Sequence, residues 1–138
     1  MVDRLTPEAR SRNMAAIRGK DTAPELAVRR MLHAMGYRFR LHRRDLPGCP
    51  DIVLPRHGEA IFVHGCFWHQ HKGCAHAPRP ASRTSYWLPK LAANVARDEC
   101  NQRELRPLGW GVIVVWECQV RRDASAVARC LQRLLATD

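Results

Sequence analysis

The spacing of apolar residues changes several times along the chain, and each change predicts a new element. Residues 6–18 have helical spacing with Thr-Pro at their start, which favours a helix there. A second helix is predicted to begin after Thr22, because Thr22 and Glu25 have the spacing of a capping box, and to end at Gly36. Two helices should therefore precede the first strand.

Alternation of apolar and basic residues over 37–42 indicates the first strand. Two short apolar runs, 52–54 and 60–63, predict the next two strands, with a turn between them. Residues 65–84 hold Gly, Pro, His and Cys without any period. A loop of that length is expected to be held by a cross-link, such as a bound metal, or to serve a function.

A third helix is predicted from about Leu88-Pro89 to Leu105. The β-branched run 112–116 follows, and its composition is typical of a strand buried on both faces. A last helix begins at Asp123. The resulting order of elements predicts an α/β sandwich with a mixed central sheet, as one domain over residues 1–138.

The net charge of the chain indicates what kind of partner it binds. The 138 residues contain 23 Lys and Arg against 13 Asp and Glu, a net charge of +10. Such an excess favours a polyanion, above all nucleic acid, although charge that serves only solubility remains an alternative. No apolar run approaches the ~20 residues that span a bilayer, and the N-terminus has no signal-peptide core. We expect a soluble, cytoplasmic protein.

Six cysteines are present, which could form three disulfides. The absence of an export signal argues against that, because thiols inside the cell stay reduced. Metal ligation of some cysteines and burial of the others is the favoured interpretation.

The first candidate site is Asp51, which stands at the start of one strand while Val63 and His64 end the next. A carboxylate at a strand end, joined by a carbonyl of the neighbouring strand, can hold Mg²⁺ together with phosphate oxygens and water. The alternative is that Asp51 only caps a turn after Pro50.

The second candidate site is a histidine- and cysteine-rich run over residues 64–74. Cys66, His71 and Cys74 have a spacing that can place three ligands around one Zn²⁺ ion. A fourth ligand would close the site. The candidates are Cys118 first, then His76 and Cys49.

Two pairs of adjacent aromatic residues, Phe67-Trp68 and Tyr86-Trp87, are predicted to lie in loops beside basic residues. Such rings can wedge between base pairs or stack on bases, or they can simply pack in the core. Two acids are weaker candidates. Glu25 is either a helix cap or a supporting catalytic acid, and Asp98 shares a helix face with Asn94 but could equally be solvated.

Taken together, these segments resemble the very short patch repair (Vsr) DNA mismatch endonuclease family. The resemblance is carried by LPGCPDIV at 46–53, HGCFWH at 64–69, YWLPK at 86–90, NVARD at 94–98 and VWEC at 115–118, together with RSRNMAAI at 10–17 and DTAPE at 21–25. These segments occur in family order along nearly the whole chain. HGCFWH is the most specific of them.

The resemblance implies a restriction-endonuclease-like fold and a monomeric enzyme. It implies a Mg²⁺-dependent nick in one strand of duplex DNA, 5′ of the thymine in a T:G mismatch that arises from 5-methylcytosine deamination. It also implies association with the nucleoid and contact with mismatch-repair proteins.

The family's roles transfer residue by residue. Asp51 and the backbone carbonyl of Val63 correspond to the Mg²⁺ site, and His69 to the proton-transfer residue. The remaining roles fall in three groups: Glu25, His64 and Asp98 as supporting catalytic residues; Cys66, His71, Cys74 and Cys118 as structural zinc ligands; Phe67, Trp68 and Trp87, with Tyr86 beside them, as the DNA wedge. Met14 lies in the N-terminal segment 1–20 that contacts DNA.

Two other functions remain open at this point. One is a restriction-type nicking enzyme of the same fold with a different DNA target. The other is a zinc-containing DNA-binding module without catalysis.

Overall fold

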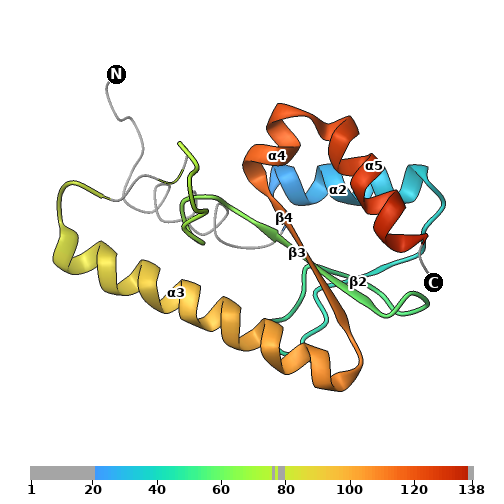
Figure 1. The fold of residues 1–138 in the computed structure, drawn as a ribbon, viewed down its shortest axis with the longest axis horizontal. Helices are drawn as coiled ribbons and strands as arrows, with labels where there is room; N and C mark the ends of the chain where they lie inside the picture. The colour runs from blue at the N-terminus through green and yellow to red at the C-terminus, as the bar shows by residue number, and fades with distance from the viewer. Residues whose placement is uncertain (1–20, 76, 78–79, 137–138) are drawn as a thin grey trace.

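The computed structural model describes residues 21–75, 77 and 80–136 (Figure 1). The predicted helix at 6–18, with Met14, and the candidate ligand His76 therefore lie outside the described residues. No helix in the described ranges is long and apolar enough to cross a membrane.

Four strands form one mixed sheet in the order β1-β2-β3-β4. They are β1 (Arg40–Leu41), β2 (Ile52–Leu54), β3 (Glu59–His64) and β4 (Gly111–Trp116). The first three are antiparallel to one another, and β4 runs parallel to β3. The predicted mixed sheet is confirmed, although β1 is shorter than the alternating run at 37–42.

Helices cover both faces of this sheet. They are α2 (Ala23–Ala34), α3 (Thr84–Leu105), α4 (Glu117–Arg122) and α5 (Ala124–Leu135), with a short 3-10 turn at Arg106–Leu108 after α3. In Figure 1, α2, α4 and α5 gather on one side of the strands, and the long α3 runs along the other. The predicted sandwich of helices around a mixed sheet is confirmed. A restriction-endonuclease-like fold and a single domain over the whole chain stay predictions.

Side-chain alternation divides the core into two layers. Ile52, Leu54 and Ile61 face α2 and α5, where they pack with Leu32 and Leu131. Val53, Ala60 and Phe62 face the other way and pack with Leu105 near the end of α3.

The same alternation positions two of the candidate site residues. Asp51 lies two residues before Val53, and His64 lies two residues after Phe62. Residues two apart in a strand share a face. Asp51 and His64 are therefore carried toward the α3 side, at one end of the sheet.

The predicted N-cap of α2 is confirmed, but the return bond of a capping box is replaced, because the Glu25 carboxylate accepts from the N–H of Asp21. Thr22 is the N-cap, and its hydroxyl accepts a hydrogen bond from the N–H of Glu25 at 3.4 Å. At the other end, Gly36 follows the helix with φ of 84°, a conformation that glycine adopts at little cost.

Three local predictions are wrong. The third helix begins at Thr84 instead of near Leu88, so Tyr86 and Trp87 lie in its first turn and not in a loop. Residues 112–114 are only half-buried, because β4 is the edge of the described sheet. The predictions also missed α4, which begins directly after β4 with no Gly or Pro between them.

Candidate active site and metal centre

A cavity of about 750 Å³ opens at the end of the sheet, between the loop after β3 and the helices α3 and α4. Five of the predicted site residues line it: Asp51, Val63, His64, His69 and Asp98. Both aromatic residues of the loop, Phe67 and Trp68, line it as well. The lining comes from five separate segments of the chain, within 21–24, 48–51, 62–69, 94–101 and 117–121.

Asp51 is tied to the neighbouring strand, because its Oδ2 accepts a hydrogen bond of 2.7 Å from the N–H of Val63. Burial raises the pKa of Asp51 from 3.8 to about 7. The Val63 hydrogen bond opposes this rise, the nearby negative charge of Glu25 adds to it, and the positive charges of His69 and Arg29 oppose it. A bound cation would remove much of the cost of ionising Asp51, so this carboxylate fits a divalent metal.

Two histidines stack beside Asp51. The rings of His64 and His69 are parallel, with their centroids 3.8 Å apart. His69 Nδ1 lies 2.6 Å from Asp98 Oδ2. Because a carboxylate only accepts, Nδ1 carries the proton, and Nε2 of a neutral His69 is the basic nitrogen.

Burial lowers the pKa of His64 to about 4, and the neighbouring charge of His69 lowers it further, while Asp98 opposes the shift. His64 is therefore a neutral ring at physiological pH. Its Nδ1 is buried and has no hydrogen-bond partner among the described residues. An orphaned polar atom in a cleft is typical of a functional site.

Glu25 lies behind the cleft and does not line it, and its side chain is 2% exposed. Arg29 donates to its Oε1 at 2.8 Å, and Nε2 of His42 lies 3.0 Å from the same oxygen. The N–H of Asp21 donates to Oε2 at 3.0 Å. Glu25 is therefore an acid in the first turn of α2 whose charge also acts on Asp51, and its supporting catalytic role stays a prediction.

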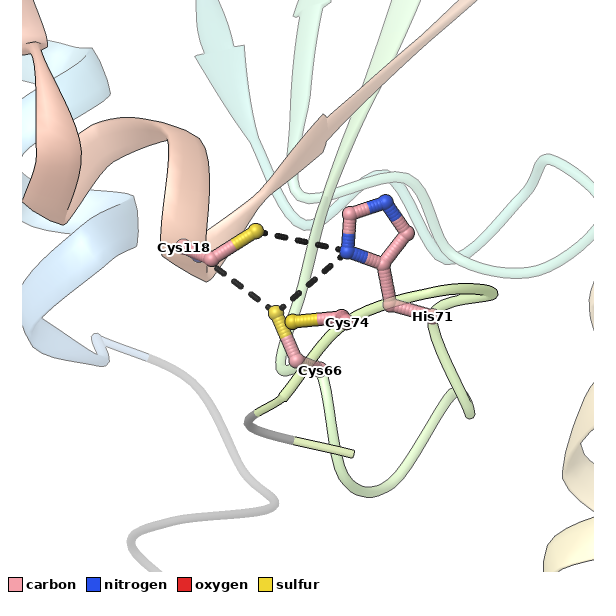
Figure 2. A group of neighbouring side chains, drawn as sticks. All are labelled: Cys66, His71, Cys74 and Cys118. Carbon is pink, nitrogen blue, oxygen red and sulfur yellow. Dashed lines mark hydrogen bonds between the residues drawn. The ribbon is translucent and has the colours of Figure 1, made fainter. Parts of the chain in front are cut away.

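The cysteine and histidine run forms a second group. The ligand atoms of Cys66, His71, Cys74 and Cys118 all lie within 4.8 Å of one another. Figure 2 shows three of them arriving from the loop after β3 and Cys118 from the start of α4, with their side chains converging. Cys49, the other candidate among the described residues, instead lines the cleft.

The chemistry of this donor set fits zinc. Nδ1 of His71 lies 3.3 Å from Sγ of Cys118 and 3.7 Å from Sγ of Cys66. Burial raises the pKa of Cys66 to about 12, against a hydrogen bond that the Cys118 N–H donates to its sulfur. Thiolates this close together need a cation, and three sulfurs with one imidazole are a typical closed Zn²⁺ set.

The four aromatic residues form one cluster, of which Phe67 and Trp68 line the cleft. The centroids of Phe67 and Trp68 are 5.1 Å apart, and Trp87 lies 5.5 Å and 5.7 Å from them. Trp68 is almost fully buried, and Asn94 donates to its carbonyl at 3.2 Å. Tyr86 is 48% exposed. The accessible part of the cluster therefore includes Tyr86 but not the buried ring of Trp68.

Sequence reasoning missed the residues that support these groups. Arg29 stands four residues after Glu25, a spacing typical of helical ion pairs that could have been noticed. Glu117 and Arg121 have the same spacing and also line the cleft. His42 had no local signal, because its contact with Glu25 crosses from the end of β1 to α2.

Comparison with known proteins shows to which family this chain belongs. The family model of the DNA mismatch endonuclease Vsr matches residues 2–76. The chain belongs to the Vsr DNA mismatch endonuclease family. The matched region includes Asp51, both stacked histidines and three of the four residues that could bind zinc, Cys66, His71 and Cys74.

Curated relatives extend the Vsr match over the rest of the chain. A protein named type II nicking enzyme V.XorIIP, from Xanthomonas oryzae pv. oryzae, is 52% identical over 98% of both chains. The DNA mismatch endonuclease Vsr of Escherichia coli is 44% identical over 88% of this chain and 77% of its own. Type II nicking enzyme V.NmeAIP of Neisseria meningitidis is 41% identical over 97% and 92%. The chain is therefore a Vsr-family nuclease that acts on DNA.

Proposed function

We propose that this Vsr-family nuclease makes a Mg²⁺-dependent nick in one strand of duplex DNA, 5′ of the thymine in a T:G mismatch. The nick would start very short patch repair of deaminated 5-methylcytosine. One observation carries the proposal. Residues 64–69 supply both stacked imidazoles of the cleft and two rings of the aromatic cluster, so chemistry and mismatch sensing share one segment.

The proposed metal site consists of the Asp51 carboxylate and the main-chain carbonyl of Val63, the residue whose N–H already holds Asp51. When bound, Mg²⁺ supplies positive charge to the scissile phosphate and to the leaving 3′ oxygen. Asp51 would hold the cation at the end of the sheet, and the cation would in turn favour ionisation of this carboxyl, whose pKa burial raises to about 7.

His69 is the proposed general base. Asp98 holds Nδ1 of His69 and so leaves Nε2 to accept a proton from the attacking water. The neutral ring of His64 stacks on His69 and fixes its plane. Glu25 acts from behind through its charge, because Arg29, His42 and the N–H of Asp21 occupy its carboxylate.

The direct test uses a T:G duplex that carries a different label on each strand. We expect a single nick 5′ of the mismatched thymine when Mg²⁺ is present, and none when it is omitted. Asp51→Ala should bind the duplex without nicking it. Asp45→Ala is the matched control, because Asp45 is an exposed carboxylate that pairs with Arg43 outside the cleft. Nicking by Asp51→Ala at the wild-type rate would overturn the metal assignment.

Specificity for the mismatch is proposed to come from the aromatic cluster. A wobble pair is easier to unstack than a Watson–Crick pair, by about 1 kcal/mol. Rings that wedge into the stack turn this difference into selectivity. Phe67→Ala should therefore lose more affinity for T:G than for T:A duplex, whereas Trp68 is too deeply buried for a clean test. Equal losses on both duplexes would contradict the wedge.

A zinc ion in the four-residue group is proposed to be structural. Four protein ligands leave no open position for water. The ion would join the loop at residues 66–74 to the start of α4 and so hold His69 and the aromatic rings in place.

A second candidate function is favoured by the names of the relatives. Several of them are called type II nicking enzymes, and one of these is 52% identical to this chain. The same catalytic residues would then nick a defined site in fully paired DNA. Nicking of a matched duplex at the rate of the mismatched one would establish this alternative. Contact with mismatch-repair proteins and association with the nucleoid stay predictions.

A further inference from the structure

The cleft presents an electrostatic problem for a DNA-binding enzyme. Among the described residues that line it are four carboxylates and only two arginines: Asp21, Asp51, Asp98 and Glu117 against Arg97 and Arg121. A polyanion approaches such a surface only if the carboxylates are neutralised. The way in which each acid is paired therefore matters.

In two of these ion pairs, the basic partner is at least partly buried. Asp98 is held by His69 at 2.6 Å, and both side chains are partly buried. Asp21 pairs with Arg29 at 2.6 Å, but the acid is the outer partner, with 63% of its side chain exposed against 15% for Arg29. Arg29 is also engaged by Glu25, so it points inward.

The pair of Glu117 and Arg121 has the opposite arrangement. Arg121 Nη2 lies 2.8 Å from Glu117 Oε2, and the arginine is the outer partner, 63% exposed against 24% for the acid. The contact given for this ion pair joins one guanidinium nitrogen to one carboxylate oxygen. An arginine has five N–H donors and a single carboxylate engages at most two of them, so donors remain for a phosphate.

The position of this pair is fixed by the sheet. Trp116, the last residue of β4, is the register partner of His64, and α4 begins at the next residue, Glu117. Glu117 and Arg121 are one helical turn apart on α4, across the sheet end from α3 (Figure 1). Both side chains of this pair line the cleft that Asp98 also lines.

We propose that Arg121, oriented by Glu117, binds a backbone phosphate of the DNA duplex. Glu117 restricts the guanidinium to the rim of the cleft and leaves its outer donors for the phosphate oxygens. The contact is independent of base sequence, because it involves the backbone alone. The inference rests on the proposed DNA-nicking function and adds a positioning contact to it.

The chain offers a matched control. Arg122 is the next residue, equally charged and also exposed on α4, but it lines a different cavity, next to His71, Cys74 and Cys118. Arg121→Gln and Arg122→Gln therefore lower the net charge by the same amount. Only the first should remove a phosphate contact.

The measurement is duplex affinity by fluorescence anisotropy in Mg²⁺-free buffer, at several salt concentrations. One lost phosphate contact lowers the salt slope by about 0.9. The advantage of wild type over Arg121→Gln should then shrink about 3.5-fold between about 50 and about 200 mM salt. The loss should be equal on T:G and T:A duplexes, and Arg122→Gln should keep the wild-type slope. Identical slopes for Arg121→Gln and wild type would overturn the proposal.

A double variant separates a phosphate contact from simple neutralisation of Glu117. Glu117→Gln/Arg121→Gln has the net charge of wild type. If Arg121 binds phosphate, the double variant keeps the reduced slope of Arg121→Gln. If Arg121 only neutralises Glu117, the double variant recovers the wild-type slope and affinity, and the proposal fails.

Nicking of the T:G duplex by the same wild-type preparation tests the underlying function separately. Wild type that nicks while the Arg121 slope is unchanged contradicts the phosphate contact alone. Wild type that neither binds nor nicks this duplex contradicts the proposed function itself, and with it the contact.

Discussion

Asp51→Asn should make the Mg²⁺-free protein more stable while it abolishes nicking. Asparagine has nearly the shape of aspartate, and its carbonyl oxygen can still accept the hydrogen bond from the N–H of Val63. What the substitution removes is a negative charge whose burial is only partly compensated. Residues that serve catalysis often carry such a cost in stability.

The pKa of Asp51 sets the magnitude. A rise from 3.8 to about 7 is about three pKa units, and each unit corresponds to about 1.4 kcal/mol. The ionised carboxylate therefore destabilises the Mg²⁺-free fold by up to about 4 kcal/mol at pH 8. Water that enters the open cleft reduces this figure, so a gain of about 2–4 kcal/mol is expected for Asp51→Asn.

The sign of the pH dependence follows from the raised pKa. Above pH 7 both the folded and the unfolded forms of wild type ionise Asp51, so the full penalty is present. Between pH 7 and pH 4 the folded form keeps its proton while the unfolded form still loses it, so the penalty shrinks as the pH falls. The stability gap between Asp51→Asn and wild type should fall to about two fifths of its pH 8 value by pH 5.

Urea unfolding at pH 8 and pH 5 measures this gap, with protein purified without chelator so that the cysteine group stays intact. Asp45→Asn is the control. Arg43 holds the pKa of Asp45 below its usual value, so removing that charge should not stabilise the fold. Added Mg²⁺ should raise the stability of wild type alone. An Asp51→Asn protein no more stable than wild type at pH 8 would refute the reasoning.

The remaining predictions concern the groups around Asp51. Metal analysis should find about one zinc per chain. Cys118→Ala should lose this zinc, and its free energy of unfolding should fall by more than about 3 kcal/mol. Cys100→Ala, at an exposed cysteine, should keep both the zinc and the wild-type stability. Asp98→Asn should slow nicking by tenfold or more at unchanged DNA affinity, because His69 loses its charged partner; Glu99→Gln, an exposed neighbour, should not. Arg29→Leu should cost about 2–3 kcal/mol, since it leaves the buried Glu25 carboxylate without its cation, and the exposed Arg30→Leu should stay within about 0.5 kcal/mol. If Arg29→Leu were as stable as Arg30→Leu, Arg29 would not be needed to hold Glu25.

Local patterns predicted the parts of the fold that depend on local chemistry. The cap of α2 at Thr22 and the stop at Gly36 followed from residue preferences at helix ends. The strand end that carries Asp51 and the neighbouring strand that ends at His64 followed from two short apolar runs. The resemblance to the Vsr family then suggested roles that spacing could not, such as proton transfer for His69.

Contacts between distant segments were beyond local patterns. His42 reaches Glu25 across the fold, and no spacing in the sequence relates them. The start of α3 was placed too late because Pro89 was interpreted as a first-turn residue, yet the helix runs through it from Thr84. The strand at 112–116 has the composition of a central strand, but composition cannot tell whether a neighbour pairs with its second edge.

The ratio of nicking rates on T:G and T:A duplexes of otherwise identical sequence tests the central claim most directly. The assay is a single-turnover reaction with wild type in excess and Mg²⁺ present, run beside Asp51→Ala. We predict rapid nicking 5′ of the mismatched thymine, at least about tenfold slower nicking of the paired duplex, and none by Asp51→Ala, since a rate ratio of ten corresponds to about 1.4 kcal/mol. Equal rates on the two duplexes would contradict mismatch-directed nicking and would establish a nicking enzyme for paired DNA.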